Sequence, residues 1–122
     1  MGVKLMYCKL TLLLLTLVSI QSFGYSGFPK EFQDKWTVNK DLCDKYLNPS
    51  SLVISEGEVS FWESIGIVKS ISKQDESLNV HFHMEGEGQR WISEETYTLS
   101  RDGKVLMRSA EEYFFKYVRC IK

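Results

Sequence analysis

Strict alternation of apolar and polar residues along positions 78–85 constrains the fold more than any other feature of this chain. The even positions are apolar: Leu78, Val80, Phe82 and Met84. The odd positions are polar: Asn79, His81, His83 and Glu85. Successive side chains of a β-strand point to opposite faces, so this segment is predicted to be a strand with one face in a core and one in water.

Short segments of the same kind recur from residue 50 onward, and turn residues separate them. Strands are predicted at 51–55, 58–63, 65–71, 78–85, 89–100, 105–108 and 113–120, with one more around 36–38. Asp102-Gly103 predicts a tight turn because both residues tolerate positive φ, and Gly66 predicts a bend or bulge within its strand. One short helix is predicted near residues 40–47, where apolar residues have helical spacing and Asn48-Pro49 would end it.

These elements indicate a mostly β fold, a small antiparallel meander of about eight strands with one short helix. Closure of the meander would hide its edge strands, so a closed or partly closed barrel is the preferred prediction. An open sheet with the helix packed on it is the alternative.

The first 24 residues differ from the rest. Lys4 and Lys9 lead into an uncharged apolar run at 10–20, and Ser22-Phe23-Gly24 supplies the small-x-small pattern that a signal peptidase requires. The run is short for a membrane span. Residues 1–24 are therefore predicted to be a cleaved signal peptide and residues 25–122 a single β domain, periplasmic or secreted. A retained N-terminal anchor is the alternative.

Removal of Cys8 with the leader leaves Cys43 and Cys120, an even pair in an exported chain. Such a pair predicts a structural disulfide. A redox-active pair is the alternative, but redox pairs typically form a Cys-x-x-Cys motif, and these two cysteines are far apart.

Positive and negative residues are interspersed, and the full chain has a formal net charge of −1. No basic stripe would neutralise a row of phosphates, so no nucleic-acid partner is expected. The mature domain is expected to be a monomer without a membrane span.

The two histidines lie at alternate positions of one predicted strand, where they would project from the same face and could chelate a metal. A two-residue loop at Glu87-Gly88 predicts these cross-strand pairs: Gly86–Gln89, Glu85–Arg90, Met84–Trp91, His83–Ile92 and His81–Glu94. The pairs explain the histidines as part of an exposed polar face. A metal site at His81, His83 and Glu94 is the alternative, and no cofactor is expected.

Candidate catalytic groups are few. Glu56, Glu58 and Glu63 could supply the carboxylate pair of a glycoside hydrolase, but their turn and strand positions explain them as solvated residues. No Gly-x-Ser-x-Gly elbow, phosphate-binding loop or Cys/His nucleophile pair occurs in the sequence. The chain is not predicted to be an enzyme.

Aromatic residues make up 13% of the chain, and several occupy both faces of one strand. Trp62, Phe114 and Tyr117 stand in segments where an alternating strand cannot bury both faces. At least one of these aromatic sets is predicted to stay exposed and to bind a partner, because Trp and Tyr are enriched among binding anchors. Packing against the segment 25–47 is the alternative.

Two resemblances accompany these patterns. Phe32-Gln33-Asp34-Lys35-Trp36 resembles the Gly-x-Trp that opens the first strand of lipocalin-like (calycin) barrels, with Asp34 in place of the glycine. This resemblance implies a barrel in which Arg119, from the last strand, packs over Trp36. A wider set of motifs resembles small exported proteobacterial proteins of unknown function: Trp36, Cys43, Phe61-Trp62-Glu63-Ser64-x-Gly66, Gly86-Glu87-Gly88-x-x-Trp91, Leu99-Ser100-x-Asp102-Gly103 and Arg119-Cys120.

Two functions are compatible with these observations. The preferred one is an exported protein-binding module, such as an inhibitor or immunity protein of the cell envelope. The alternative is a lipocalin-like binder of a small apolar ligand. A core filled by Trp36, Phe61, Phe82 and Trp91 would favour the first, and an apolar cavity of several hundred Å³ the second.

Overall fold

The computed structural model describes residues 24–120, so the predicted signal peptide lies outside the described residues except for Gly24. Nine strands are present: β1 (Gly24–Tyr25), β2 (Asp34–Thr37), β3 (Ser51–Ile54), β4 (Glu58–Ser60), β5 (Ile65–Gln74), β6 (Ser77–Gly86), β7 (Gln89–Leu99), β8 (Val105–Ala110) and β9 (Tyr113–Arg119). Two 3₁₀ turns, η2 (Lys30–Phe32) and η3 (Lys40–Leu42), are the helical elements of the described part. None of its helices has the length and apolar character needed to cross a bilayer.

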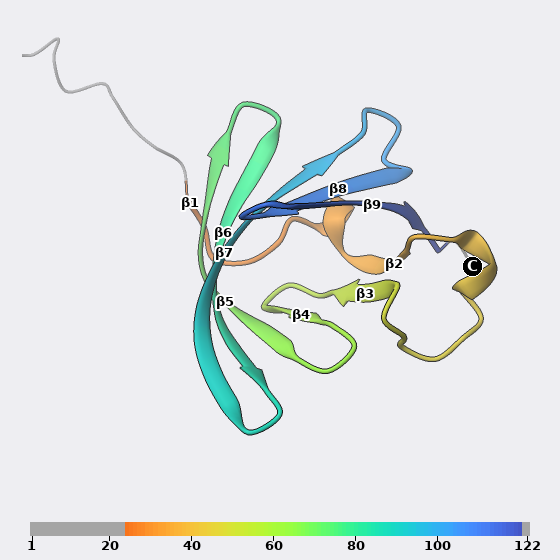
Figure 1. Ribbon diagram of the computed structural model, residues 1–122. Coiled ribbons are helices and arrows are strands. Elements are labelled where there is room, and N and C mark those ends of the chain that lie inside the picture. The colour runs from red at the N-terminus through yellow and green to blue at the C-terminus, as the bar shows by residue number, and fades with distance from the viewer. Residues whose placement is uncertain (1–23, 121–122) are drawn as a thin grey trace, which may run out of the picture.

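The strands form a closed antiparallel barrel of eight, and β1 is an additional strand paired with β5. The order around the barrel is β5-β4-β3-β2-β9-β8-β7-β6, and β6 returns to pair with β5. The long strands β5, β6 and β7 make one wall, and the shorter strands extend away from it (Figure 1). The predicted barrel is confirmed, and the open-sheet alternative is wrong.

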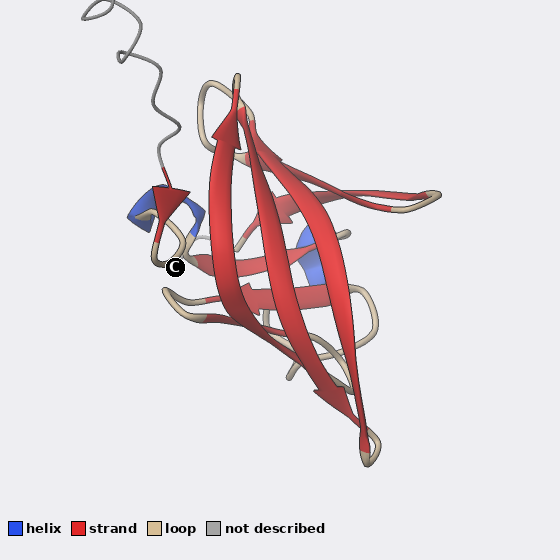
Figure 2. Ribbon diagram, turned by 90° about the vertical axis from the view of Figure 1, so that its left-hand side faces the viewer, coloured by secondary structure: helices blue, strands red, loops and turns tan. Residues whose placement is uncertain are grey.

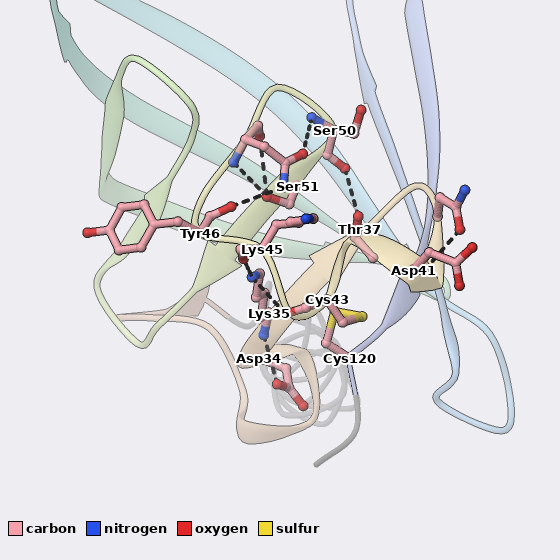
Figure 3. The surroundings of a disulfide bond; sticks show 12 residues. Asp34, Lys35, Thr37, Asp41, Cys43, Lys45, Tyr46, Ser50, Ser51 and Cys120 are labelled. Carbon is pink, nitrogen blue, oxygen red and sulfur yellow. Dashed lines mark hydrogen bonds between the residues drawn. A yellow bond between two sulfur atoms is a disulfide. The ribbon is translucent and has the colours of Figure 1, made fainter.

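The predicted helix near residues 40–47 is wrong, since that segment contains only the 3₁₀ turn η3. Tertiary contacts of the segment outweigh its local helical spacing. The ammonium group of Lys35 donates to the carbonyl oxygens of Cys43, at 3.0 Å, and of Lys45 (Figure 3). These bonds fasten the segment to β2 through the Lys35 side chain.

The predicted disulfide between Cys43 and Cys120 is present, with the two Cα atoms 5.5 Å apart (Figure 3). It ties the loop after β2 to the end of β9 across a sequence separation of 77 residues. The bridge therefore joins the first and last strands of the barrel, which already pair through Trp36 and Arg119.

The predicted register of the β6–β7 hairpin is confirmed at every pair, from Gly86–Gln89 to His81–Glu94. Glu87 and Gly88 both have positive φ, which matches the right-handed twist of a hairpin. The bulge predicted at Gly66 is misplaced, because β5 slips between Val68 and Ser70. Gly66 serves close packing: a Cβ there would lie 2.9 Å from the Met84 sulfur.

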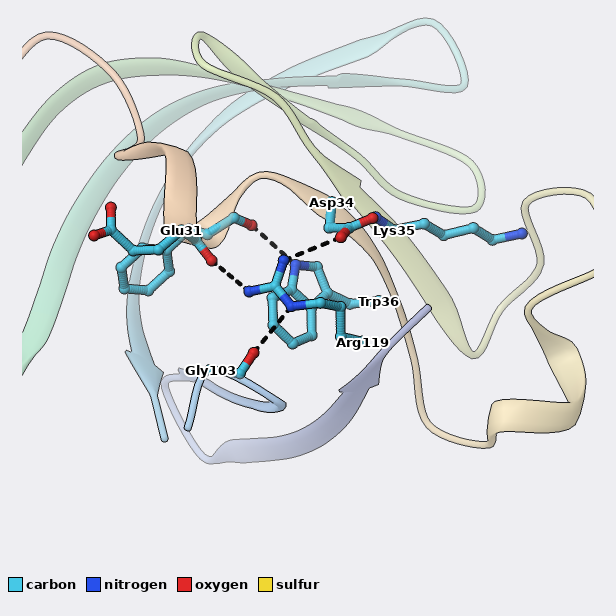
Figure 4. A network of polar contacts seen from close by, with 7 residues as sticks. Glu31, Asp34, Lys35, Trp36, Gly103 and Arg119 are labelled. Atoms are coloured by element: carbon cyan, nitrogen blue, oxygen red, sulfur yellow. Dashed lines mark hydrogen bonds and ion pairs between the residues drawn. The ribbon is translucent and has the colours of Figure 1, made fainter. Parts of the chain in front are cut away.

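One end of the barrel is closed by Phe28, Phe32 and Trp36, all buried. The Trp36 indole N–H donates to the Phe32 carbonyl oxygen at 2.9 Å. The guanidinium carbon of Arg119 lies 4.3 Å from the centre of the Trp36 ring, which is the contact implied by the calycin resemblance (Figure 4). Arg119 also bonds to Asp34 and to the carbonyl oxygens of Glu31 and Gly103, so it fastens this end of the barrel.

Candidate functional site

A cavity of about 350 Å³ opens at the barrel end opposite the Trp36–Arg119 pair. Aromatic side chains form its walls: Phe61, Trp62, Trp91 and Phe115. Polar side chains form its floor: Glu95, Arg108 and Tyr117. We call this cavity and its aromatic walls the aromatic mouth.

The floor is built around an ion pair between β7 and β8. Arg108 donates through Nε to Glu95 Oε1 at 2.9 Å and through Nη2 to Glu95 Oε2 at 2.8 Å. Tyr97 donates its hydroxyl to Glu95 at 2.6 Å, and Arg108 Nη1 donates to the Tyr117 hydroxyl oxygen at 3.1 Å. A bidentate arginine–carboxylate pair with further bonds fixes the geometry of both groups.

Strand alternation explains why these charged groups point inward. Odd-numbered residues of β7 face the barrel interior, so Glu95 lies on the same face as Tyr97. Arg108 stands directly opposite Tyr97 in the β7–β8 pairing and reaches Glu95, the next residue of β7 on the same face. Burying either charge alone would be costly, and their mutual bonds offset that cost.

The pKa values of both floor tyrosines are raised. Burial raises the pKa of Tyr97 well above its usual value, and the charge of Glu95 raises it further. Burial also raises the pKa of Tyr117, although the Arg108 cation opposes that effect. Both phenols are therefore protonated at neutral pH.

Aromatic rings also hold the guanidinium of Arg108. Its central carbon lies 4.6 Å from the centre of the Phe61 ring and 5.0 Å from that of Phe115. These are cation–π distances. The described residues use three of the five N–H donors of Arg108, which leaves two for a group that enters the mouth.

The rim of the mouth exposes aromatic surface. Trp62 is 50% exposed, and Trp91 is 44% exposed. Tyr113 extends the inner row of β9, with its ring stacked on Phe115 at 6.3 Å between centres. Bulky rings thus line the entrance from three segments that are distant in sequence.

The three aromatic residues singled out from the sequence do not share one site. Trp62 is exposed and lines the mouth, whereas Phe114 is exposed on the outer face of β9. Tyr117 is only 5% exposed, so the exposed aromatic residues among the three are Trp62 and Phe114. Odd-numbered residues of β9 point into the barrel, and Tyr117 therefore belongs to the floor.

Sequence reasoning missed the floor pair itself. Glu95 interrupts the inward row that contains Trp91 and Tyr97, and Arg108 shares its inward face with Leu106. The signal that would have identified this pair is a charged residue at an inward-facing position of the alternation, on each of two neighbouring strands.

The histidines lie away from the mouth, on the outer face of β6. His81 Nε2 is 3.8 Å from Glu94, whose carboxylate accepts a hydrogen bond from the Asn79 amide at 2.9 Å. His83 stands opposite Ile92. Within residues 24–120, no group of three or more His, Cys, Asp and Glu side chains is arranged to hold a metal ion.

No known protein family, curated protein or solved structure matches this chain.

Proposed function

We propose that this chain is an exported protein-binding module and that the aromatic mouth is its contact surface. The observation that carries the proposal is the exposure of Trp62 and Trp91 around a cavity with a fixed polar floor. Binding hot spots are typically Trp, Tyr and Arg side chains gathered at the centre of an interface. The mouth presents all three types within one surface.

The filled interior supports a protein partner over a large apolar ligand. Trp36, Phe82 and Tyr97 are fully buried along the barrel axis, and Phe61 packs against this core. Of the four residues expected to fill the core, only Trp91 stands at the rim instead. The mouth cavity is near the lower limit for small-molecule sites, and it suits one side chain of a partner.

The disulfide supports export. Cys43–Cys120 requires an oxidising compartment to form and persist, and the sequence of the first 24 residues has the pattern of a secretory signal. An inhibitor or immunity protein directed against an enzyme of the cell envelope is the class of module we propose.

A small ligand is the second candidate, and one observation favours it. Arg108 has two further N–H donors at the bottom of an aromatic-walled cavity. This arrangement suits a small planar molecule that carries a hydrogen-bond acceptor, and it does not suit a long apolar chain.

Site-specific photo-crosslinking in the native host tests the proposal. A photoreactive phenylalanine analogue replaces Trp62 in one variant and Tyr25 in a control variant. Tyr25 is partly exposed at the opposite end of the barrel. A discrete protein adduct from position 62 but not from position 25 is expected. Equal labelling from both positions, or none from position 62, would contradict the proposal.

A further inference from the structure

Part of strand β7 is an uncovered sheet edge. Residues Gln89–Thr98 of β7 pair with β6, but β8 pairs only within Thr96–Leu99. The remaining residues extend beyond the β8–β9 hairpin, as the long strands do in Figure 2. A cleft of about 460 Å³ lies beside this edge, between Ile92 and Glu111. The barrel is therefore closed at one level and open along this stretch.

The alternation of hydrogen bonding along β7 shows which residues have unpaired backbone groups. In an antiparallel strand, residues alternate between those bonded to one neighbour and those whose N–H and C=O face the other. Just beyond β7, the Ser100 N–H donates to the Val105 carbonyl oxygen at 2.9 Å. The backbone N–H and C=O groups of even-numbered β7 residues therefore point toward β8. Three even-numbered residues continue past the end of β8: Arg90, Ile92 and Glu94. Their N–H and C=O groups have no backbone partner among residues 24–120.

The side chains along this edge are complementary to those of the same edge in a second copy of the chain. Arg90 and Glu94 lie symmetrically on either side of Ile92. If a second copy of the edge runs antiparallel about a two-fold axis at Ile92, each Arg90 stands opposite the Glu94 of the other copy. The two Ile92 side chains then stand opposite each other. Opposite-charge and apolar cross-strand pairs stabilise such a ladder.

We propose that two copies of this chain associate through β7, forming a continuous sheet across a two-fold axis. The free N–H and C=O groups of these residues would form two hydrogen bonds at the Ile92 pair and two at each Arg90–Glu94 pair. The inference goes beyond the proposed function, because it concerns a second copy of the chain at the backbone edge of β7, although Trp91 of the same stretch also lines the aromatic mouth. It differs from the monomer expected from the sequence.

The exposed apolar residues of this wall support the proposal. Ile92 is 75% exposed, and it extends a cross-strand row on the outer face that contains Ile67 and His83. In the proposed dimer, this row continues into the same row of the second copy. The most exposed isoleucine of the described residues is then covered. Charges on an edge strand can instead serve to prevent pairing, and in that case the chain would remain a monomer.

Charge reversal tests the register. Sedimentation equilibrium of the purified protein over a range of concentrations should show a reversible change from the mass of one chain to that of two. Arg90→Glu and Glu94→Arg should each weaken the dimer at least about tenfold, because each places like charges opposite one another at two positions. The double variant restores both pairs and should dimerise. An equimolar mixture of the two single variants should form a heterodimer.

Matched variants separate this edge from other causes. Lys116→Glu changes a charge on β9, away from the proposed contact, and should leave the dimer unchanged. Circular dichroism checks that each variant is folded, since Glu94 also accepts a bond from Asn79. A wild-type mass of one chain at every concentration would overturn the proposal. A dimer that tolerates both single reversals, or a mixture of the two that stays monomeric, would also overturn it.

Discussion

Arg108 and Glu95 form a bidentate ion pair inside the barrel, with nitrogen–oxygen distances of 2.9 and 2.8 Å. Glu95 is almost fully buried, so its removal leaves an arginine without its counter-charge in a largely dry site. Loss of one partner of a buried pair costs about 3 kcal/mol or more. Glu95→Ala should lower the free energy of unfolding by that amount in urea titrations.

The matched control for that change is the exposed pair between Glu85 and Arg90, whose closest atoms are 3.4 Å apart. Glu85→Ala should cost less than about 1 kcal/mol, because water screens an exposed ion pair. Equal losses from Glu95→Ala and Glu85→Ala would show that the floor pair does not stabilise the barrel.

Stability should fall at alkaline pH. Burial raises the pKa of Tyr97 well above its ordinary value of 10.0, so the folded protein holds this proton more tightly than the unfolded chain does. The contribution is complete below about pH 10 and is lost as the pH rises toward the folded pKa, at up to about 1.4 kcal/mol per pH unit. Unfolding free energies measured across this range should show the decline.

Tyr97→Phe removes the group with the larger shift and should make that decline shallower, with the part due to the raised pKa of Tyr117 remaining, while Tyr113→Phe, at an exposed position, should leave it unchanged. A steep alkaline loss that persists in Tyr97→Phe would assign the effect to other groups.

Cys43 and Cys120 should be oxidised in the exported protein. Intact-mass measurement should show a chain that begins at Tyr25 and weighs two hydrogens less than the reduced form. Replacing both cysteines by serine should cost about 4.5 kcal/mol on chain-entropy reasoning for a loop of this size. Two reactive thiols in the native, non-reduced protein would refute the bridge.

The histidines should not be needed for a metal. His81 and His83 have cross-strand neighbours, Glu94 and Ile92, that explain their positions on an exposed face. The double change to alanine should therefore shift the melting temperature little, with zinc content near zero before and after. A stoichiometric zinc ion that disappears with the double change would revive the metal site.

The sequence predicted the barrel well because alternation and turn chemistry are local signals. The register of β6 and β7 followed from one two-residue turn, since a shift of one residue would have turned every apolar side chain outward. The helix near residues 40–47 was wrong because apolar spacing does not report the tertiary contacts of that segment, which include the Cys43–Cys120 bridge and the bonds from Lys35 to its carbonyls.

The candidate site was only partly predictable. Trp62 was identified because its predicted strand, 58–63, has bulky residues on both faces; β4 ends at Ser60, and Trp62 follows it, exposed at the mouth. Which of Phe114 and Tyr117 is exposed could not be predicted, because periodicity shows which residues share a face but not which face is inward at the end of a barrel. Glu95 and Arg108 come from different strands, and only the β7–β8 register brings them together.

Affinity for the partner recovered by crosslinking tests the central claim, that the aromatic mouth binds another protein. The dissociation constants of four proteins are compared: wild type, Trp62→Ala, Phe114→Ala and Tyr25→Ala. Trp62→Ala should weaken binding by roughly 2 kcal/mol or more, about thirtyfold, with unchanged folding, whereas Phe114→Ala and Tyr25→Ala should stay close to wild type. An unchanged affinity of Trp62→Ala, or an equal loss in all three variants, would contradict the account.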